Sequence, residues 1–479
     1  MIQHIPIGPM DPHRFAGVIS PAEYEELLGL IDRAGAELRG RVIWNVNSTA
    51  KGGGVVELLR PLIGYSRGAG VDARWVVIAG DPEFFTITKR LHNHLHGVEG
   101  DGGPFGAPEH AAYEHPLAAA AAELVPLVHP RDVVILHDPQ TAGLVSAIRR
   151  TGATVIWRCH VGLDDPNDRA REAWTFLRPY ILEADAYVFS RAAFAWEGLA
   201  EGKIAVIQPS IDVFSPKNAD QTRQQSLAIL TRAGISAYRV AVDATFSRSD
   251  GTPGRIDRTA QLVEEAPLSP EDRVVTQVSR WDKLKDPLGV LRSFTEQVAG
   301  QVQAHLLLAG PSTDAVADDP EGASVFAAVR EAWQELPVNV RRLVHLALLP
   351  MEDVEENAAI VNAIQRHADV ILQKSIAEGF GLTVAEAMWK QRAVVASRIG
   401  GIQDQIVDGE SGVLVHDPRD LREFGAAVAG LLANPERALR IGIAARLRVL
   451  HHFLGPHHLG RYFELIHRLL ALREAGGGS

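Results

Sequence analysis

Two glutamates, Glu378 and Glu386, bracket the expected start of a helix with seven residues between them. Gly379 and Gly381 lie in this interval and would expose backbone amides. A carboxylate accepts two hydrogen bonds at once, which suits sugar hydroxyls. Glu378 would precede the first turn and Glu386 would lie further into the helix, so that one ligand is contacted at two points. The alternative, a capping acid and a solvated helix residue, is disfavoured by the glycines and by the strand expected directly before them.

Two cations, Arg280 and Lys285, follow an expected strand at residues 273–278. In an open α/β sheet, ligands collect at the carboxyl ends of the strands, and two cations there suit a diphosphate. Taken alone, an arginine and a lysine in a polar loop are more often simply solvated. The glutamate pair at the end of another strand makes the diphosphate interpretation the stronger one.

A glycine-rich loop, residues 47–54, lies between an expected strand and an expected helix. Gly52, Gly53 and Gly54 allow close approach of a ligand to the backbone, and the amides at a helix N-terminus attract anions. The loop matches neither the dinucleotide-binding GxGxxG pattern nor a P-loop. A plain strand-to-helix turn is the alternative, but such a turn needs one glycine rather than three.

These loops belong to two series of short Val/Ile-rich runs that alternate with longer amphipathic segments, a pattern typical of parallel sheets covered on both faces. The first series predicts strands at residues 41–46, 73–79, 133–136, 154–159, 187–190 and 204–207, with helices at 55–67 and 141–150 among them. The second predicts strands at 273–278, 305–309, 344–348, 370–373, 393–397 and 412–415. The intervening residues 214–272 are polar and helix-like, and no strand is predicted there.

The fold class is therefore α/β, with two doubly wound, Rossmann-like domains. We expect an N-terminal domain at residues 1–212 and a second domain at 213–454. The last amphipathic run, 459–473, follows a Gly-Pro break and has no strand after it, so residues 455–475 are expected to return to the first domain.

Composition excludes several classes of function. The chain has 479 residues and a formal charge of −11, which disfavours a non-specific grip on nucleic acid or anionic lipid. Its single cysteine, Cys159, fits a reducing compartment, and neither a signal peptide nor a membrane-spanning run is predicted, so we expect a cytoplasmic protein. His92, His94 and His96 lack a carboxylate at a zinc-site spacing, and no metal site is predicted.

The ordered set of motifs resembles the retaining GT-B glycosyltransferases of family four. The glutamate pair resembles that family's E-x7-E motif, Arg280 and Lys285 resemble its diphosphate-binding pair, and residues 52–54 resemble its first glycine loop. Residues 400–402 and 408–412 resemble two further loops, and residues 209–212 resemble its Pro-Asn-Gly-Val-Asp hinge. This sequence departs from the hinge pattern at Ser210 and lacks its glycine. The resemblance covers nearly the whole chain and implies two domains that face a central cleft.

Within that family, residues 47–59, 80–85, 88–93, 136–140 and 158–160 resemble the enzymes that form or cleave trehalose. The resemblance implies retaining transfer of glucose from a nucleoside diphosphate glucose to free glucose, giving α,α-trehalose in a reversible reaction. One alternative is a retaining trehalose phosphorylase, which the chain length disfavours mildly. An alternative of another class is a nucleotide-binding protein without catalysis.

The resemblance also implies roles for individual residues. The catalytic set is Arg280, Lys285, Glu378 and His160. The donor-binding set is Gly53, Gly54, Arg280, Lys285, Phe380, Gly381, Leu382 and Glu386, and the acceptor-binding set is Asp138, His137 and Asn47. No nucleophile is assigned, no cofactor is required, Mg²⁺ is expected at most to stimulate the reaction, and the base of the nucleotide (uracil, adenine or guanine) is left open. The expected partners are the nucleotide sugar, glucose and trehalose, with a homodimer as the expected assembly.

Overall fold

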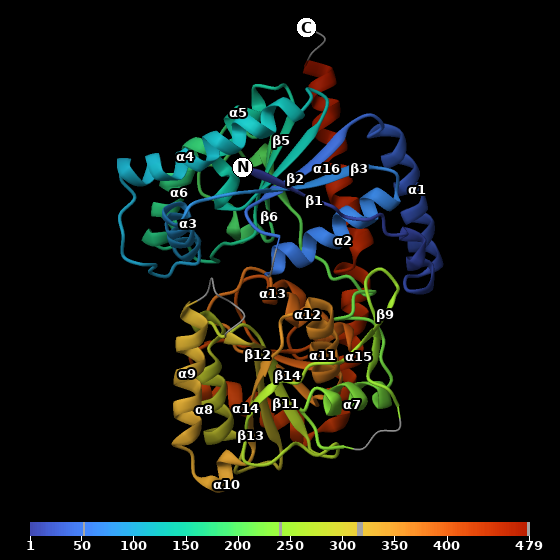
Figure 1. The fold of residues 1–479 in the computed structure, drawn as a ribbon, viewed down its shortest axis with the longest axis vertical. Coiled ribbons are helices and arrows are strands. Elements are labelled where there is room, and N and C mark those ends of the chain that lie inside the picture. The colour runs from blue at the N-terminus through green and yellow to red at the C-terminus, as the bar shows by residue number, and fades with distance from the viewer. Residues whose placement is uncertain (51–52, 239–241, 314–319, 477–479) are drawn as a thin grey trace. The chain divides into compact units, whose positions relative to one another are not determined.

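The computed structural model describes residues 1–50, 53–238, 242–313 and 320–476, and Figure 1 labels its elements. The chain divides into two compact units. The first comprises Met1–Ser210 and Phe453–Ser479, and the second comprises Ile211–His452. Among the described residues no helix combines the length and the apolar character that crossing a bilayer requires.

The first unit is built on a seven-stranded sheet. Its strands are β1 (Ile2–Ile5), β2 (Val42–Asn47), β3 (Asp72–Ile78), β4 (Val133–His137), β5 (Thr154–Cys159), β6 (Ala186–Phe189) and β7 (Ile204–Val206). They lie in the order β1-β3-β2-β4-β5-β6-β7. All neighbours are parallel except β1 and β3, which pair antiparallel from Ile2 opposite Ile78 to Ile5 opposite Trp75.

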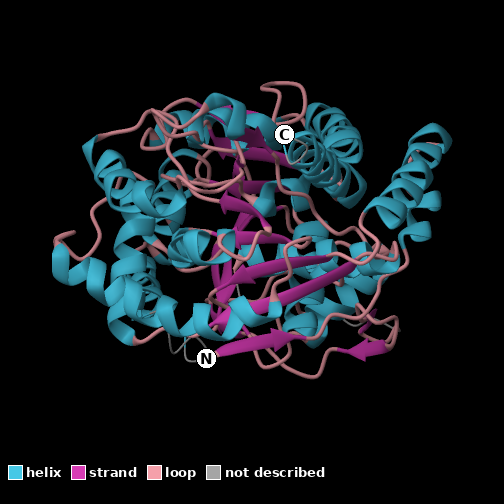
Figure 2. Ribbon diagram, turned by 90° about the horizontal axis from the view of Figure 1, so that it is seen from above, coloured by secondary structure: helices cyan, strands magenta, loops and turns pink. Residues whose placement is uncertain are grey.

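Helices cover both faces of this sheet, and each face has its own apolar core. The helices of one face are α1 (Pro21–Glu37), α2 (Gly54–Gly68) and α16 (Gly455–Gly476). Those of the other are α3 (Pro82–Leu95), α4 (Ala107–Leu124), α5 (Val145–Arg149) and α6 (Asp168–Ile181). Because both faces are covered, β4 and β5 are buried along their whole length. Helices on both sides of the strands are visible in Figure 2.

The second unit has a sheet of the same size. Its strands are β10 (Gln261–Val263), β11 (Val274–Val278), β12 (His305–Pro311), β13 (Val344–Leu349), β14 (Val370–Gln373), β15 (Ala393–Ser397) and β16 (Val413–Val415). The order is β10-β13-β12-β11-β14-β15-β16, and only β10 runs antiparallel to its neighbour.

The helices of the second unit also lie against both faces of its sheet. One core holds α8 (Pro287–Gln297), α9 (Pro320–Gln334) and α14 (Leu421–Ala433). Three more helices pack against the sheet. Helix α11 (Val354–His367) contacts β11, and both α12 (Leu382–Trp389) and α15 (Pro435–His452) contact β15. The remaining helices are α7 (Arg223–Arg232), which packs on α11, and the short α10 (Val338–Arg341) and α13 (Ile402–Gln405).

All twelve predicted strands are confirmed, and the class of two doubly wound α/β domains is correct. The prediction that residues 214–272 contain no strand is wrong. They hold β10 and a separate hairpin of β8 (Thr245–Ser247) and β9 (Pro253–Arg255). Each of these strands has only three residues, which is too short for a periodic pattern to be recognised. The predicted helix at 141–150 consists of a 3₁₀ helix, Pro139–Leu144, followed by α5.

The strand order decides where ligands are expected. In the first sheet the order reverses between β2 and β4, and in the second it reverses between β11 and β14. At such a point the loops that follow the two strands diverge and leave a crevice beyond their carboxyl ends. The loops after these four strands are the ones that carry most of the predicted site residues.

Candidate active site

Lys285 and Glu378 lie together at the carboxyl edge of the second sheet. Lys285 ends the loop after β11, Glu378 lies in the loop after β14, and the ammonium forms an ion pair with the carboxylate. The two side chains are 17 % and 11 % exposed, so the pair is largely withdrawn from water. The structure therefore joins two motifs that are 93 residues apart in the chain.

Hydrogen bonds join the loop after β11 to the loop after β14 next to this ion pair. The Gln277 side-chain amide donates to the Lys285 carbonyl at 2.8 Å, and its oxygen accepts from the Lys374 N–H at 2.9 Å. The Ile376 N–H donates to the Leu284 carbonyl at 2.7 Å. One buried glutamine thus sets the spacing of both loops, so that the Lys285–Glu378 pair is held by backbone contacts as well as by charge.

Lys374 is a second buried cation of this edge. Its ammonium contacts the Asp286 carboxylate and donates to the Pro418 carbonyl at 2.6 Å. Asp286 has a left-handed backbone (φ 45°) and caps α8 by accepting from the Gly289 N–H at 3.0 Å. Lys374 therefore anchors the end of the Arg280–Lys285 loop, and its ammonium has a structural role.

Arg280 is an exposed cation of the same loop. Its side chain is 53 % exposed, and the guanidinium lies 3.1 Å from the Asp282 carboxylate. Asp282 also accepts from the Leu284 N–H at 2.8 Å, which fixes it in the loop. A guanidinium that is oriented at its base and open at its tip can engage a diphosphate by two parallel hydrogen bonds.

The glycine segment after Glu378 brings backbone close to the same edge. Gly381 is the N-cap of α12 and has φ 85°, and a Cβ there would approach the Glu378 Cγ to 3.3 Å. The Gln405 side-chain amide donates to the Phe380 carbonyl, and the Gly401 N–H donates to the Gly379 carbonyl at 3.1 Å. The carbonyls of this turn thus have partners within the unit. The N-terminus of α12, which begins at Leu382, is built for an anion or a hydroxyl.

Glu386 lies one turn into α12, and its side chain is only 4 % exposed. The Lys217 ammonium is 3.5 Å from its carboxylate. The two glutamates of the motif thus differ in depth and in the cation that each of them meets.

In the first unit, three predicted residues gather after β4 and β5. His137 Nδ1 lies 3.1 Å from His160 Nε2, and His137 Nε2 lies 3.1 Å from the Asn45 side-chain oxygen. The two imidazole rings stack with their centroids 5.4 Å apart. Burial lowers the pKa of His137 to about 3 and the pKa of His160 well below its usual range, and the nearby Arg158 guanidinium lowers both further. Both histidines are therefore neutral hydrogen-bonding groups at physiological pH.

Asp138 lies beside this pair in a conformation that few non-glycine residues adopt (φ 66°). Its carboxylate accepts from the His160 N–H at 2.7 Å, and its own N–H donates to the Arg158 carbonyl at 2.7 Å. Burial raises the pKa of Asp138 to about 7, against the lowering effect of the His160 N–H and of Arg158. This carboxyl group is the one in the cluster that titrates near neutrality.

Asn47 is engaged by its own unit. Its side-chain oxygen accepts from the Trp75 indole N–H at 2.8 Å, and its amide donates to the Thr49 carbonyl at 2.7 Å. These bonds shape the start of the glycine loop, in which Gly53 has φ 83° and precedes α2 at Gly54. Lys51 and Gly52 of this loop lie outside the described residues.

Several polar residues that support these sites were not predicted from the sequence. They are Asn45, Arg158, Lys217, Gln277 and Lys374. Arg158 is fully buried and donates to the Ile207 carbonyl at 2.7 Å and to Ser190 Oγ at 3.0 Å. The available signal was a polar or charged residue inside a buried strand, or directly after one. In the part of the chain that the structure describes, no three or more histidine, cysteine or acidic side chains form a group that could hold a metal ion.

Solved structures of sugar-phosphate synthases share this architecture. A sucrose-phosphate synthase from Thermosynechococcus elongatus superposes with a TM-score of 0.61 at 16 % identity, over 90 % of this chain and 100 % of that one. A UDP-forming α,α-trehalose-phosphate synthase from Burkholderia vietnamiensis superposes with a TM-score of 0.62 at 14 % identity, over 91 % and 100 % of the two chains. The fold is that of the GT-B glycosyltransferases.

Sequence comparison places the chain within that class. Residues 45–196 match the family model "Trehalose synthase, N-terminal domain", and residues 260–448 match "Glycosyl transferases group 1". The chain is 35 % identical to a trehalose synthase of Pyrococcus horikoshii, over 93 % of this chain and 94 % of the relative. It is also 34 % identical to a trehalose synthase of Rubrobacter xylanophilus, over 93 % and 95 %. The protein is an enzyme, a glycosyltransferase, and belongs to the trehalose synthase family.

The trehalose phosphorylases are more distant. That of Pleurotus pulmonarius is 25 % identical over 82 % of this chain, but the match spans only 53 % of the phosphorylase. The family membership therefore rests on the synthases.

Proposed function

We propose that this enzyme transfers glucose, with retention at the anomeric carbon, from a nucleoside diphosphate glucose to free glucose and forms α,α-trehalose. The observation that carries the proposal is the convergence of Arg280, Lys285 and Glu378 at the switch point of the second sheet, in a chain of the trehalose synthase family. The reaction is reversible, because it exchanges the bond from the anomeric carbon to the diphosphate for one glycosidic bond.

The second unit holds the donor in this proposal. Arg280 and Lys285 bind the diphosphate and stabilise the charge that grows on it as the bond from the anomeric carbon breaks; removal of one such group typically costs about 100- to 1,000-fold in rate. Glu378 accepts from hydroxyls of the donor glucose, and Glu386 accepts from the ribose. The amides of Phe380, Gly381 and Leu382 add donors at the start of α12.

The first unit supplies two neutral imidazoles and the Asp138 carboxyl group for the sugars. Asp138 orients the acceptor glucose with His137 and with the loop that Asn47 shapes, and His160 holds a hydroxyl of the donor glucose. Gly53 and Gly54 permit close approach of the donor. The acceptor oxygen attacks the anomeric carbon from the same face from which the diphosphate leaves. The proton of the acceptor hydroxyl passes to a phosphate oxygen, and the electron pair of the broken bond remains on the diphosphate. No protein nucleophile is needed.

The proposal extends to cofactor, assembly and location. Because Arg280 and Lys285 supply two positive charges, no protein-bound metal is required, and Mg²⁺ at most stimulates the reaction. The enzyme acts as a homodimer, in line with the commonest symmetry of soluble oligomers, and in the cytoplasm, in line with its single buried cysteine. Activity in excess chelator and sedimentation of the purified enzyme test the first two statements, and fractionation of cells tests the third.

Product release from trehalose distinguishes the synthase from a phosphorylase. The purified enzyme is incubated with trehalose and either UDP, ADP, GDP or inorganic phosphate, and free glucose is measured. We expect glucose with at least one nucleoside diphosphate and none with phosphate alone. Glucose that appears only with phosphate would overturn the proposal in favour of phosphorolysis. Nucleotide binding without sugar transfer from any donor would support a non-catalytic protein.

A further inference from the structure

Lys217 lies in a segment without regular structure that precedes α7, and it meets Glu386 of α12 across 169 positions of the chain. Its ammonium is 3.5 Å from the Glu386 carboxylate, and the two side chains are 21 % and 4 % exposed. A carboxylate this deeply buried requires opposite charge or hydrogen-bond donors, because desolvation of the ion is costly. Lys217 supplies such a charge from the more accessible side.

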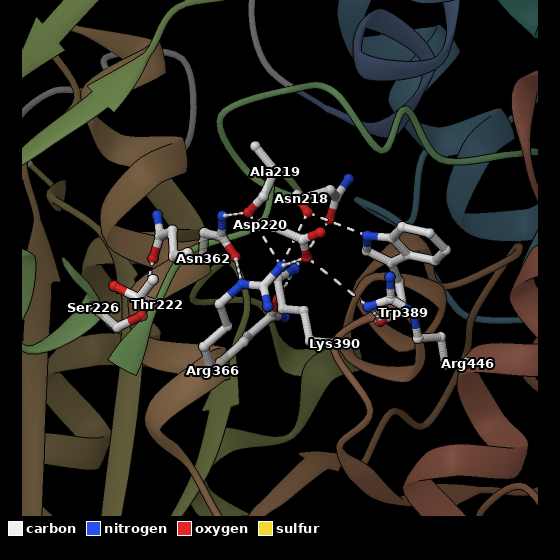
Figure 3. A network of polar contacts seen from close by, with 12 residues as sticks. Asn218, Ala219, Asp220, Thr222, Ser226, Asn362, Arg366, Trp389, Lys390 and Arg446 are labelled. Carbon is white, nitrogen blue, oxygen red and sulfur yellow. Dashed lines mark hydrogen bonds and ion pairs between the residues drawn. The ribbon is translucent and has the colours of Figure 1, made fainter. Parts of the chain in front are cut away.

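The backbone on both sides of Lys217 is held by side chains of α11 and α12. Figure 3 shows the contacts after Lys217, where Asn362 and Trp389 meet Ala219 and Asn218. The fully buried Asn362 donates from one amide group to the Pro216 carbonyl at 3.0 Å and to the Ala219 carbonyl at 2.8 Å. The Trp389 indole N–H donates to the Asn218 carbonyl at 3.2 Å. Lys217 therefore projects from a fixed segment, although it belongs to no helix or strand.

Lys390 ties this segment to the helix that bears Glu386. Its buried ammonium donates to Gln365 Oε1 at 2.7 Å, to Asn218 Oδ1 at 3.0 Å and to the Glu386 carbonyl at 3.2 Å. These three acceptors match the three N–H groups of an ammonium. Lys390 thus donates its hydrogen bonds to neutral acceptors, although burial lowers its pKa and the Glu386 carboxylate also acts on its charge and raises the pKa against that effect. Lys217 forms the ion pair with the Glu386 carboxylate.

Arg366 and Arg446 complete the network around the same segment. Arg366 donates to the Ala219 carbonyl at 3.1 Å and to the Asp220 carboxylate at 3.0 Å, while the Arg446 guanidinium lies 4.0 Å from the centre of the Trp389 ring. Figure 3 shows these side chains converging on the segment from helices of the second unit. So many polar contacts to one short loop are explained if the loop must hold the Lys217 side chain in a defined position.

We propose that Lys217 is a positioning residue of the nucleotide site, whose ammonium holds the Glu386 carboxylate in the orientation that receives the ribose hydroxyls. This inference rests on the proposed function, in which Glu386 binds the ribose. Lys217 is positioned in turn by Asn362, Trp389 and Lys390, because these side chains fix the backbone from which Lys217 extends. The segment after the first unit thus takes part in donor binding without touching the donor.

The test compares ribose with deoxyribose nucleotides on the same protein sample. Dissociation constants are measured by titration calorimetry for UDP, ADP and GDP and for their 2′-deoxy forms, and the ratio of the two constants is the readout. Because both ligands report on the same folded fraction, partial unfolding of a variant leaves the ratio unchanged. The variants are Lys217→Met, Lys217→Arg, Glu386→Gln and, as the control, Arg440→Met, which removes an exposed cation of α15.

For the wild type we expect the ribose form to bind about tenfold more tightly than the deoxy form, the effect of one hydrogen bond to a charged acceptor. Lys217→Met should reduce this preference to about twofold or less, Lys217→Arg should keep most of it, and Arg440→Met should keep all of it. A full ribose preference in Lys217→Met, together with its loss in Glu386→Gln, would overturn the role of Lys217 and leave the proposed function intact. A full preference in Glu386→Gln would instead remove the ribose assignment on which both depend.

Discussion

The carboxyl group of Asp138 makes the activity of this enzyme depend on pH in a predictable direction. Its pKa is raised to about 7 by burial, whereas His137, with a pKa of about 3, stays neutral over the working range. If the ionised carboxylate is needed to accept a hydrogen bond from the acceptor glucose, kcat/KM for glucose falls as pH is lowered through about 7. The ionised fraction is about 9 % at pH 6 and about 91 % at pH 8, so the expected rise between these values is about tenfold.

The assay follows release of nucleoside diphosphate at saturating donor and limiting glucose, from about pH 5 to pH 9. In Asp138→Asn the acid limb should disappear and the plateau should fall, because an amide oxygen is a weaker acceptor than a carboxylate. Circular dichroism at each pH serves as the control. A profile that is flat in the wild type, or an acid limb that persists in Asp138→Asn, would refute the assignment.

Stability provides an independent check, because its dependence on pH has the opposite sign. The folded-state pKa of Asp138 is raised above the ordinary 3.8, so the native protein binds the proton more tightly than the unfolded chain. The contribution of this group to stability is therefore full below about pH 3.8 and is lost as pH rises through about 7. Since each pKa unit corresponds to about 1.4 kcal/mol, the shift corresponds to about 4 kcal/mol at most. Acid loss of activity therefore cannot be explained by destabilisation through Asp138.

Three further perturbations test the structure of the site. Lys285→Met should lower kcat/KM by about 100-fold or more. It should also cost up to about 3 kcal/mol of stability, because it leaves the buried Glu378 carboxylate without its ammonium partner. The double variant with Glu378→Gln should regain the melting temperature of the wild type but not its activity. Gly381→Ala should cost about 1–2 kcal/mol, measured by urea denaturation, because φ 85° is unfavourable for alanine and the new methyl group would lie 3.2 Å from Ile402. Arg158→Met should raise the pKa values of His137 and His160, readable as chemical shifts of their ring protons, because the buried guanidinium lowers both.

The sequence predicted the position of the active-site loops because their signals are local. Each loop directly follows a run of buried Val, Ile or Leu, so that Arg280, Glu378 and Asp138 could be assigned to the carboxyl ends of strands without knowledge of the strand order. The ion pair between Lys285 and Glu378 was not predicted, because it depends on β11 and β14 being neighbours in the sheet.

What the sequence did not predict depends on contacts between distant positions. Lys217 and Glu386 are separated by 169 positions, and nothing in the local pattern around Lys217 distinguishes it from a solvated lysine. The edge strands β1 and β10 were missed for a related reason: with four and three residues they carry little periodicity, and they form because β3 and β13 offer them an edge to pair with.

The candidate sites of the two units differ in charge, and this difference agrees with the separate roles that we propose for them. In the second unit the cations Arg280 and Lys285 are held at the edge of the sheet, where a chain with a net charge of −11 can still attract a diphosphate. In the first unit a buried guanidinium, Arg158, lies among groups whose ionisation burial suppresses, so that His137 and His160 remain neutral. Neutral imidazoles can bind sugar hydroxyls without the cost of desolvating an ion, whereas a diphosphate requires opposite charge. This distribution of charge is in line with the proposal that the second unit binds the donor nucleotide and the first unit binds the acceptor sugar.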